Sequence, residues 1–147
     1  MQTRVEMPFG DGEYVFWLPL PQVVELERVT GRPMLAIEES LRQAIGGTGD
    51  GELSFLGGGS ANAKDVLDVL RLGLIGGNSG MVDGEEVEVG PIRAKQLVEQ
   101  YAYPARPLSE GVVQAWRVLS AAIFGVELKK KAEPDPGENP SDTEKDS

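Results

Sequence analysis

The chain has 147 residues, of which 40% are hydrophobic, and this fits one domain with a core of its own. It contains neither cysteine nor histidine, which excludes disulfides, thiolate nucleophiles and the commonest metal ligands and general bases, so that only carboxylate-based catalysis stays open. The formal net charge of −10 repels phosphate and anionic lipid, so it argues against nucleic acid and membranes as partners and favours a protein with a basic or apolar surface.

The first 18 residues predict a β-hairpin. Residues 3–9 alternate loosely between polar and apolar side chains, and Gly10-Asp11-Gly12 is typical of a tight turn. Residues 13–18 follow as a strand that is rich in aromatic and β-branched side chains. A two-stranded hairpin is marginally stable alone, so this one is expected to pack on helices or on another chain.

The sequence carries no recognisable targeting or membrane signal. Residues 1–6 lack the apolar core of a signal peptide, and no stretch reaches the roughly 20 apolar residues of a membrane span. We therefore expect a cytoplasmic protein without membrane contact.

Two helices that begin at prolines are predicted next. Pro21 suits the first position of a helix that runs to Thr30. Pro33 opens a second helix, whose apolar positions keep helical spacing as far as Ile45. The adjacent acidic residues Glu38 and Glu39 are expected on the solvated face of this second helix.

A glycine-rich stretch separates these helices from a third. Residues 46–62 predict a loop, within which 53–56 is either a short strand or an apolar tether. Asn62 suits the N-cap of a helix over residues 63–75, with an aspartate at its third position. The glycine-rich residues 76–80 are expected to stop this helix.

Two more helices are predicted after an acidic segment. Residues 83–89 are expected to be a loop, and Pro91 starts a fourth helix. The fifth helix begins near Leu108 and has apolar residues at spacings of three and four until Gly125 ends it. Trp116 follows this spacing and is expected in the core.

Together these elements predict a mainly α fold with a small N-terminal β-hairpin (α+β), whose body is a compact bundle of about five helices. Residues 1–125 form this domain. Residues 126–147 are polar, charged and rich in proline, and they cannot bury enough apolar area to offset the entropy of ordering. They are expected to form a disordered charged tail.

The sequence offers no convincing motif for catalysis or cofactor binding. Residues 57–60 and 73–80 resemble phosphate loops in their glycine content, but neither ends in Lys-Ser/Thr. The acidic residues 83–88 lack the ligand spacing of a calcium loop, and the serines have no histidine to activate them. We therefore expect no enzyme activity, no cofactor and no metal.

Aromatic side chains are the better candidates for function. Trp17 lies on the strand face opposite Tyr14 and Phe16, and an exposed tryptophan is a typical binding anchor, although a place in the core fits this position equally well. Val15 shares the face of Trp17. We take Trp17, Val15 and Tyr103 as the candidate protein-binding residues.

Three blocks of sequence carry a family resemblance. They are Gly10-Asp11-Gly12-Glu13-Tyr14 through Leu18 with Val24-Glu25-Leu26-Glu27 and Thr30-Gly31, then Val66 through Arg71-Leu72-Gly73-Leu74-Ile75-Gly76-Gly77, and finally Arg106-Pro107-Leu108 with Ala115 through Phe124-Gly125. In their order and spacing they resemble the gene-transfer-agent family of phage tail proteins, of the tail assembly chaperone type. The resemblance spans about residues 5 to 125, and none of its blocks is a catalytic motif.

The resemblance implies a role in tail morphogenesis. Such chaperones bind the tape measure protein in the bacterial host cytoplasm and keep it soluble while tail tube subunits assemble around it. The implied partners are therefore the tape measure protein, the tail tube protein and further copies of this chain. Two alternatives stay open: a structural tube component of the particle, and a small acidic regulatory adaptor.

Overall fold

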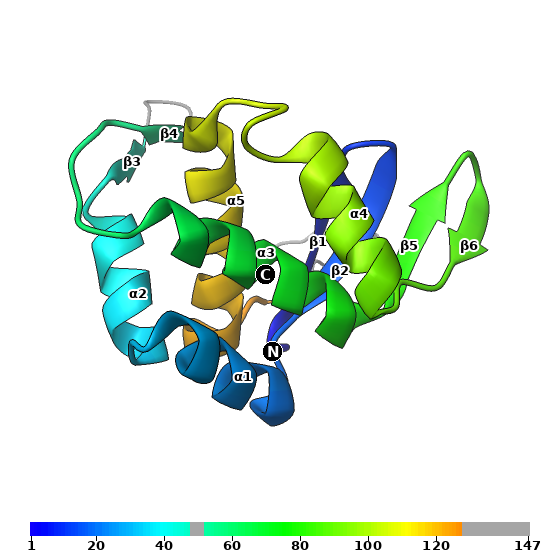
Figure 1. Cartoon of the computed structure of the whole chain (residues 1–147), viewed down its shortest axis with the longest axis horizontal. Coiled ribbons are helices and arrows are strands. Elements are labelled where there is room, and N and C mark those ends of the chain that lie inside the picture. Colours follow the sequence, from blue (N-terminus) through cyan, green and yellow to red (C-terminus); the bar gives the residue numbers. More distant parts are fainter. Residues whose placement is uncertain (48–51, 128–147) are drawn as a thin grey trace, which may run out of the picture.

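A computed structural model describes residues 1–47 and 52–127. The helices of this part of the chain are α1 (Leu20–Thr30), α2 (Met34–Arg42), α3 (Ala63–Gly77), α4 (Pro91–Tyr101) and α5 (Leu108–Phe124). The strands are β1 (Arg4–Phe9), β2 (Gly12–Trp17), β3 (Ile45–Gly47), β4 (Leu53–Phe55), β5 (Ser79–Val82) and β6 (Glu85–Val87). Figure 1 shows the helices gathered in the middle, with the β3–β4 hairpin at one end and the β5–β6 hairpin at the other.

A four-stranded antiparallel sheet in the order β1-β2-β5-β6 forms one layer of the molecule. Its first two strands confirm the predicted N-terminal hairpin, because Arg4 pairs with Trp17 and Phe9 pairs with Gly12 around the turn. One face of this hairpin is buried under α3, α4 and α5. The buried side chains of that face include Met7, Phe9, Tyr14 and Phe16.

The expected fold class, a helical bundle with only a small hairpin, is wrong in its sheet content. The five expected helices are present in the described residues, but the hairpin is half of a larger sheet, and β3 and β4 form a second one. The physical reason is that β5 pairs with β2 across a long sequence separation, with Tyr14 opposite Gly80. Such a pairing has no local sequence signal.

The acidic segment after α3 is a hairpin and not the expected loop. Asp83 and Gly84 both have positive φ values, of 52° and 80°, and they form the two-residue turn between β5 and β6. Positive φ at both positions suits the twist of a two-residue hairpin, and Asp-Gly is among its preferred sequences. Because the segment is so acidic, the sequence pattern favoured a loop in spite of the Asp-Gly pair.

The second helix is shorter than expected because the chain after it turns into a strand. Helix α2 ends at Arg42, and Ile45 then pairs with Phe55 in the antiparallel β3–β4 ladder. A bond from the N–H of Leu56 to the carbonyl of Ala44 extends the ladder at 2.7 Å. Of the two interpretations of residues 53–56, the short strand is therefore the right one.

The glycines at the end of α3 let this helix approach β2 closely. Helix α3 continues through Gly76 and Gly77, which were expected to stop it, and ends at Asn78 in the left-handed conformation. A Cβ atom on Gly77 would overlap the backbone oxygen of Val15, and one on Gly76 would overlap that of Trp17. The two glycines therefore allow helix and strand backbones to touch.

The two ends of the described chain meet beside β1. The backbone of Gln2 and that of Val126 exchange two hydrogen bonds, of 3.0 and 2.7 Å. Residues 128–147, most of the expected charged tail, lie outside the described residues. Within the described part, no helix is both long enough and apolar enough to cross a membrane.

Candidate protein-binding surfaces

The outer face of the four-stranded sheet carries Trp17. Its indole N–H donates to Oγ1 of Thr3 at 2.9 Å, and the guanidinium of Arg4 lies 4.4 Å from the ring centroid. Val15, two positions earlier on the same face, is half-buried like Trp17. Both sequence-predicted residues of β2 therefore belong to one surface, where Arg4 covers part of the indole and the rest reaches solvent.

Tyr103 does not join these two residues. It lies in the loop between α4 and α5 and is 48% exposed. Two residues earlier, the Tyr101 ring packs edge-on against Phe9, beside the turn of the β1–β2 hairpin. Trp17 lies at the opposite end of that hairpin, since it pairs with Arg4. The three candidates thus divide between two separate surfaces.

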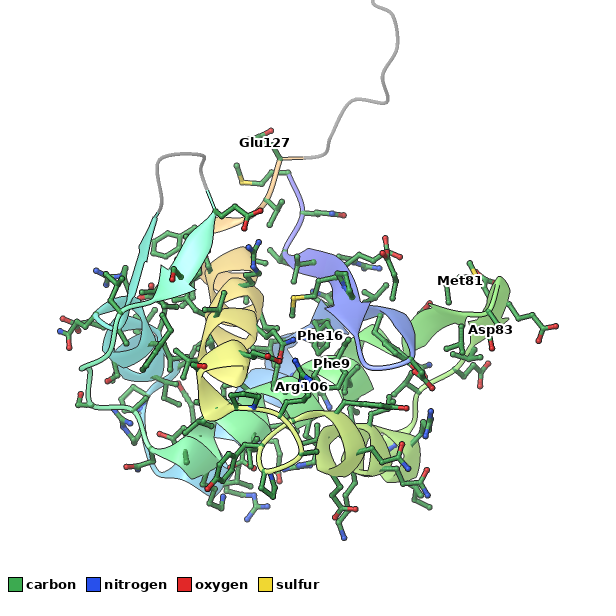
Figure 2. All side chains as sticks on the ribbon, turned by 90° about the horizontal axis from the view of Figure 1, so that it is seen from above. Phe9, Phe16, Met81, Asp83, Arg106 and Glu127 are labelled. Carbon is green, nitrogen blue, oxygen red and sulfur yellow. The ribbon has the colours of Figure 1, made fainter. Side chains whose placement is uncertain are left out.

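Two hollows flank the first turns of α5. One, of about 530 Å³, lies between α5 and β4; it is lined by Leu53, Ser54, Phe55, Ser109, Glu110, Val113 and Gln114. The other, of about 380 Å³, lies between α5 and the turn of the β1–β2 hairpin; it is lined by Pro8, Phe9, Gly10, Tyr101, Arg106, Glu110 and Gln114. Sequence reasoning missed these hollows because their walls come from segments that are distant along the chain. Figure 2 shows Phe9 and Arg106 close together at the second hollow.

A third, smaller hollow connects the β3–β4 hairpin to the core. It has a volume of about 160 Å³, and Phe55 forms part of its wall as it does in the first hollow. Apolar side chains dominate the lining, among them Leu41, Val66 and Val112. The phenyl ring of Phe55, which is 40% exposed, therefore separates solvent from an apolar recess.

The β5–β6 hairpin is an arm that leaves the body of the molecule (Figure 1). Three residue pairs join it to β2, from Glu13 opposite Met81 to Val15 opposite Ser79, and Val82 and Val87 pack against the core. Met81 is 42% exposed, and Figure 2 shows it with Asp83 near the tip of the arm. The arm and the strand exit carry four carboxylates and no cation: Asp83, Glu85, Glu86 and Glu88.

A buried tyrosine fixes the β1–β2 turn against α4. The Tyr14 hydroxyl donates to Oδ1 of Asp11 at 2.5 Å, and Arg93 on α4 reaches Oδ2 of the same carboxylate at 3.1 Å. Burial and the nearby Asp11 carboxylate raise the pKa of Tyr14 to about 12. This contact holds the wall of the second hollow in place.

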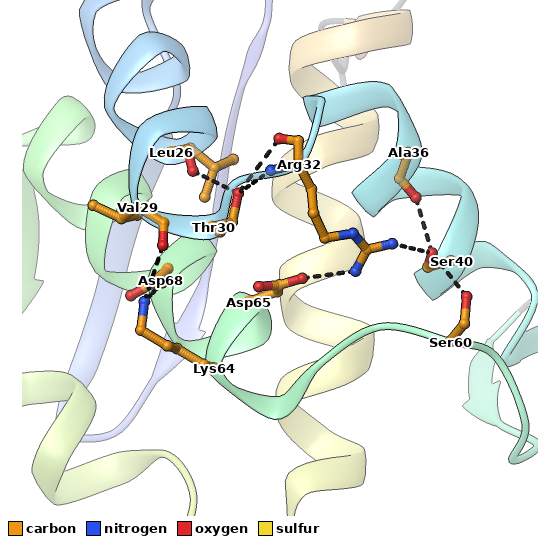
Figure 3. Close-up of polar contacts among 10 residues, drawn as sticks. All are labelled: Leu26, Val29, Thr30, Arg32, Ala36, Ser40, Ser60, Lys64, Asp65 and Asp68. Carbon is orange, nitrogen blue, oxygen red and sulfur yellow. Dashed lines mark hydrogen bonds and ion pairs between the residues drawn. The ribbon is translucent and has the colours of Figure 1, made fainter.

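A polar network joins the corner between α1 and α2 to α3 (Figure 3). Arg32 donates to Oδ2 of Asp65 at 2.8 Å and to Oγ of Ser40 at 2.9 Å, and Ser40 lies 3.2 Å from the hydroxyl of Ser60. Asn62 is the N-cap residue of α3 and Asp65 lies in its first turn, as expected, but the Asn62 side chain makes no capping bond and the Asp65 carboxylate is buried against Arg32. The network therefore stabilises the packing of α2 and the α1–α2 corner against α3.

Glu38 lies inside the protein, contrary to the expectation of a solvated face. It is 3% exposed, and its carboxylate accepts hydrogen bonds from Arg42 at 2.9 Å and from the indole of Trp116 at 3.1 Å. Trp116 is half-buried and packs against the core, with its polar edge turned to this carboxylate. A buried carboxylate that is paired in this way links α2 to α5.

Among the described residues, no group of three acidic side chains is placed to hold a metal ion. The polar clusters described above are each made of paired groups that connect one element to another. What the molecule offers on its surface is an aromatic sheet face, two hollows beside α5 and an acidic arm. These features suit contacts with protein chains.

Comparison with known families gives one match. A family model described as the phage tail tube protein GTA-gp10 matches residues 2–125. The match confirms the resemblance to the gene-transfer-agent family of phage tail proteins, but not the tail assembly chaperone type. Neither a curated protein nor a solved structure matches the chain.

Proposed function

The chain belongs to the GTA-gp10 family of phage tail tube proteins, and on this basis we propose that it is a structural component of the tail of a phage or gene transfer agent. The observation that carries this proposal is the extent of the match, because residues 2–125 include every described helix and strand. Membership of a tail protein family favours a role in the tail over the role of a small regulatory adaptor.

The proposed role is binding and not catalysis. A tube is built from many copies of one subunit, and each copy needs at least two different surfaces that fit one another. The sheet face at Trp17, the hollows beside α5 and the acidic arm are formed by different elements of this molecule. This distribution supports a subunit with several neighbours in an assembly that forms in the host cytoplasm.

Inactivation of the gene tests the structural role. We expect particles without tails, or with shortened tails, and recovery of normal tails when the intact gene is supplied again. Variants of the surface residues should then separate assembly from folding. Normal tails in the absence of the protein would refute a structural role.

A tail assembly chaperone that binds the tape measure protein is the second candidate. It is favoured by the net charge of −10 together with exposed apolar side chains such as Leu20, Leu35 and Ile92. Coating an aggregation-prone client with such copies would cover apolar stripes and add charge. Co-expression distinguishes the two roles, since a chaperone would convert an insoluble tape measure protein into a soluble complex, whereas a tube subunit would not.

A further inference from the structure

Strand β4 has a free edge beside the larger hollow. In the β3–β4 ladder the pair Ala44–Leu56 is hydrogen-bonded, so the backbone groups of Leu53 and Phe55 point away from β3. Within residues 1–47 and 52–127 these groups have no hydrogen-bond partner on that side. The 530 Å³ hollow lies at this edge and is bounded on its other side by α5. The place beside β4 is therefore open to one more short strand.

Strand β6 has a free edge at the tip of the arm. The pair Val82–Glu85 flanks a two-residue turn and is hydrogen-bonded, so the N–H and C=O groups of Glu86 point away from β5. No helix packs on β6 in the described structure beyond a marginal contact. The arm thus presents a three-residue strand with one open side, the same length as β4.

The remaining edge of the larger sheet, on β1, is obstructed at both ends. Val126 occupies the bonding groups of Gln2, and Pro8 lies at an outward-facing position, where it has no N–H to offer. The larger sheet is thus open at β6, and the smaller sheet is open at β4 beside the hollow. Figure 1 shows these two edges at opposite ends of the long axis of the molecule, an arrangement that lets one copy offer its arm to the next.

The charged residue in the lining of the hollow is Glu110, which is paired with Arg106, and the cation that can face the arm lies one helical turn further along α5. The arm carries only carboxylates, whereas Arg117 on α5 is exposed and forms no ion pair with another described residue. Arg117 follows Val113 and Gln114 by one helical turn, so it lies on the same side of α5 as the lining of the hollow. A cation at this position would face the carboxylates of a docked arm.

From these observations we propose that copies of this chain join head to tail, with the β5–β6 arm of one copy seated in the hollow beside α5 and its β6 edge paired with the β4 edge of the next copy. The contact is heterologous, so its repetition closes into a ring or continues as a filament. This inference rests on the proposed structural role and names the surface through which copies would associate.

Cysteine cross-linking tests the contact directly, because the natural chain has no cysteine. One sample carries Ser54→Cys on β4 and another carries Glu86→Cys on β6. Paired strands lie about 5 Å apart, so a short bifunctional thiol reagent should join the two variants when they are mixed. The dimer should contain one copy of each, and the chain that carries both substitutions should give a ladder of higher oligomers.

Two control variants test whether the cross-links are specific. A mixture of Ser54→Cys with Ile92→Cys, whose side chain is 77% exposed on α4, should stay monomeric. Leu53→Pro added to the doubly substituted chain leaves both thiols in place and should abolish the ladder, because it removes an outward N–H of β4 without touching the bonds between β3 and β4. Its circular dichroism spectrum should match that of the parent.

The contact is refuted if Ser54→Cys cross-links to itself as readily as to Glu86→Cys, or if the mixture cross-links no better than the Ile92→Cys control. If the contact is refuted while the protein is still found in particles, the proposed function stands and the surface is wrong. If the protein is absent from particles, the proposed function fails whatever the cross-linking shows. High salt should weaken the contact, whereas Arg117→Glu should weaken it at low salt as well.

Discussion

The indole N–H of Trp116 donates a hydrogen bond of 3.1 Å to Oε2 of Glu38, which lies 78 positions earlier in the chain. Glu38 is almost fully buried, and its other hydrogen-bond donor is Arg42 on the same helix. The bond joins α2 to α5. Helix α2 also contacts β3, and helix α5 contacts β4. A large aromatic side chain thereby contributes both apolar packing and a donor for a buried charge.

Trp116→Phe should lower the free energy of unfolding by about 1–3 kcal/mol, because it keeps much of the ring packing but removes a donor from a buried carboxylate. Trp116→Ala should cost about 3–5 kcal/mol, since packing is lost too. Urea unfolding measures both. The matched control is Glu39→Gln, at the exposed neighbour of Glu38, which should change stability by less than about 0.5 kcal/mol. A Trp116→Phe effect as small as that control would show that the hydrogen bond is unimportant.

Gly77→Ala should destabilise the protein by about 1–3 kcal/mol or more, although alanine is the better helix former. The added Cβ would overlap the backbone oxygen of Val15 and force α3 away from β2. Gly47→Ala is the control, because its Cβ would meet its nearest neighbour at 3.8 Å, an ordinary contact. Thermal unfolding of the two variants decides the matter, and equal melting temperatures would contradict the close approach.

Tyr14 should give stability a pH dependence in the alkaline range. Its pKa of about 12 in the folded protein lies above the ordinary value of 10.0. The protonated phenol therefore contributes fully to the free energy of unfolding below about pH 10, and this contribution is lost as the pH rises through about 12. The difference in unfolding free energy between the natural protein and Tyr14→Phe should shrink over that range. A difference that stays constant would argue against the raised pKa.

Trp17 and Phe16 are neighbours on β2 that should differ sharply in their effect on stability. Phe16 is fully buried, so Phe16→Ala should cost about 3–5 kcal/mol. Trp17 lies half-buried on the outer face, where stacking with Arg4 contributes about 0.5–1 kcal/mol, so Trp17→Ala should cost less than half as much. Chemical denaturation compares the pair. Equal costs would place Trp17 in the core and remove it as a candidate for protein binding.

Local patterns were enough to predict most of the elements. The Asp-Gly turn and the aromatic strand predicted the first hairpin, and the prolines at 21, 33 and 91 marked helix starts within a residue or two of their positions. Spacing of apolar residues predicted α5 from Leu108 to Phe124. Each of these features depends on residues that are close in sequence.

Long-range features could not be predicted in the same way. The fit between Gly77 and Val15, the pairing of β2 with β5 and the burial of Glu38 under Trp116 all depend on segments that meet only in the folded chain. The β5–β6 hairpin had a usable signal in Asp83-Gly84, which the surrounding carboxylates obscured. For the candidate site, sequence placed Trp17 and Val15 on one face but could not show the hollows beside α5, whose walls come from separate elements.

The composition of purified tail-bearing particles tests the structural role most directly. Particles are separated from free protein by density-gradient sedimentation, and the copy number of this chain is measured against that of the major capsid protein by quantitative mass spectrometry. A structural tail component should remain with intact particles in a fixed, multiple-copy ratio and should disappear from tailless particles. If intact particles lack the protein while the lysate holds it in complex with the tape measure protein, the structural role is contradicted and the chaperone takes its place.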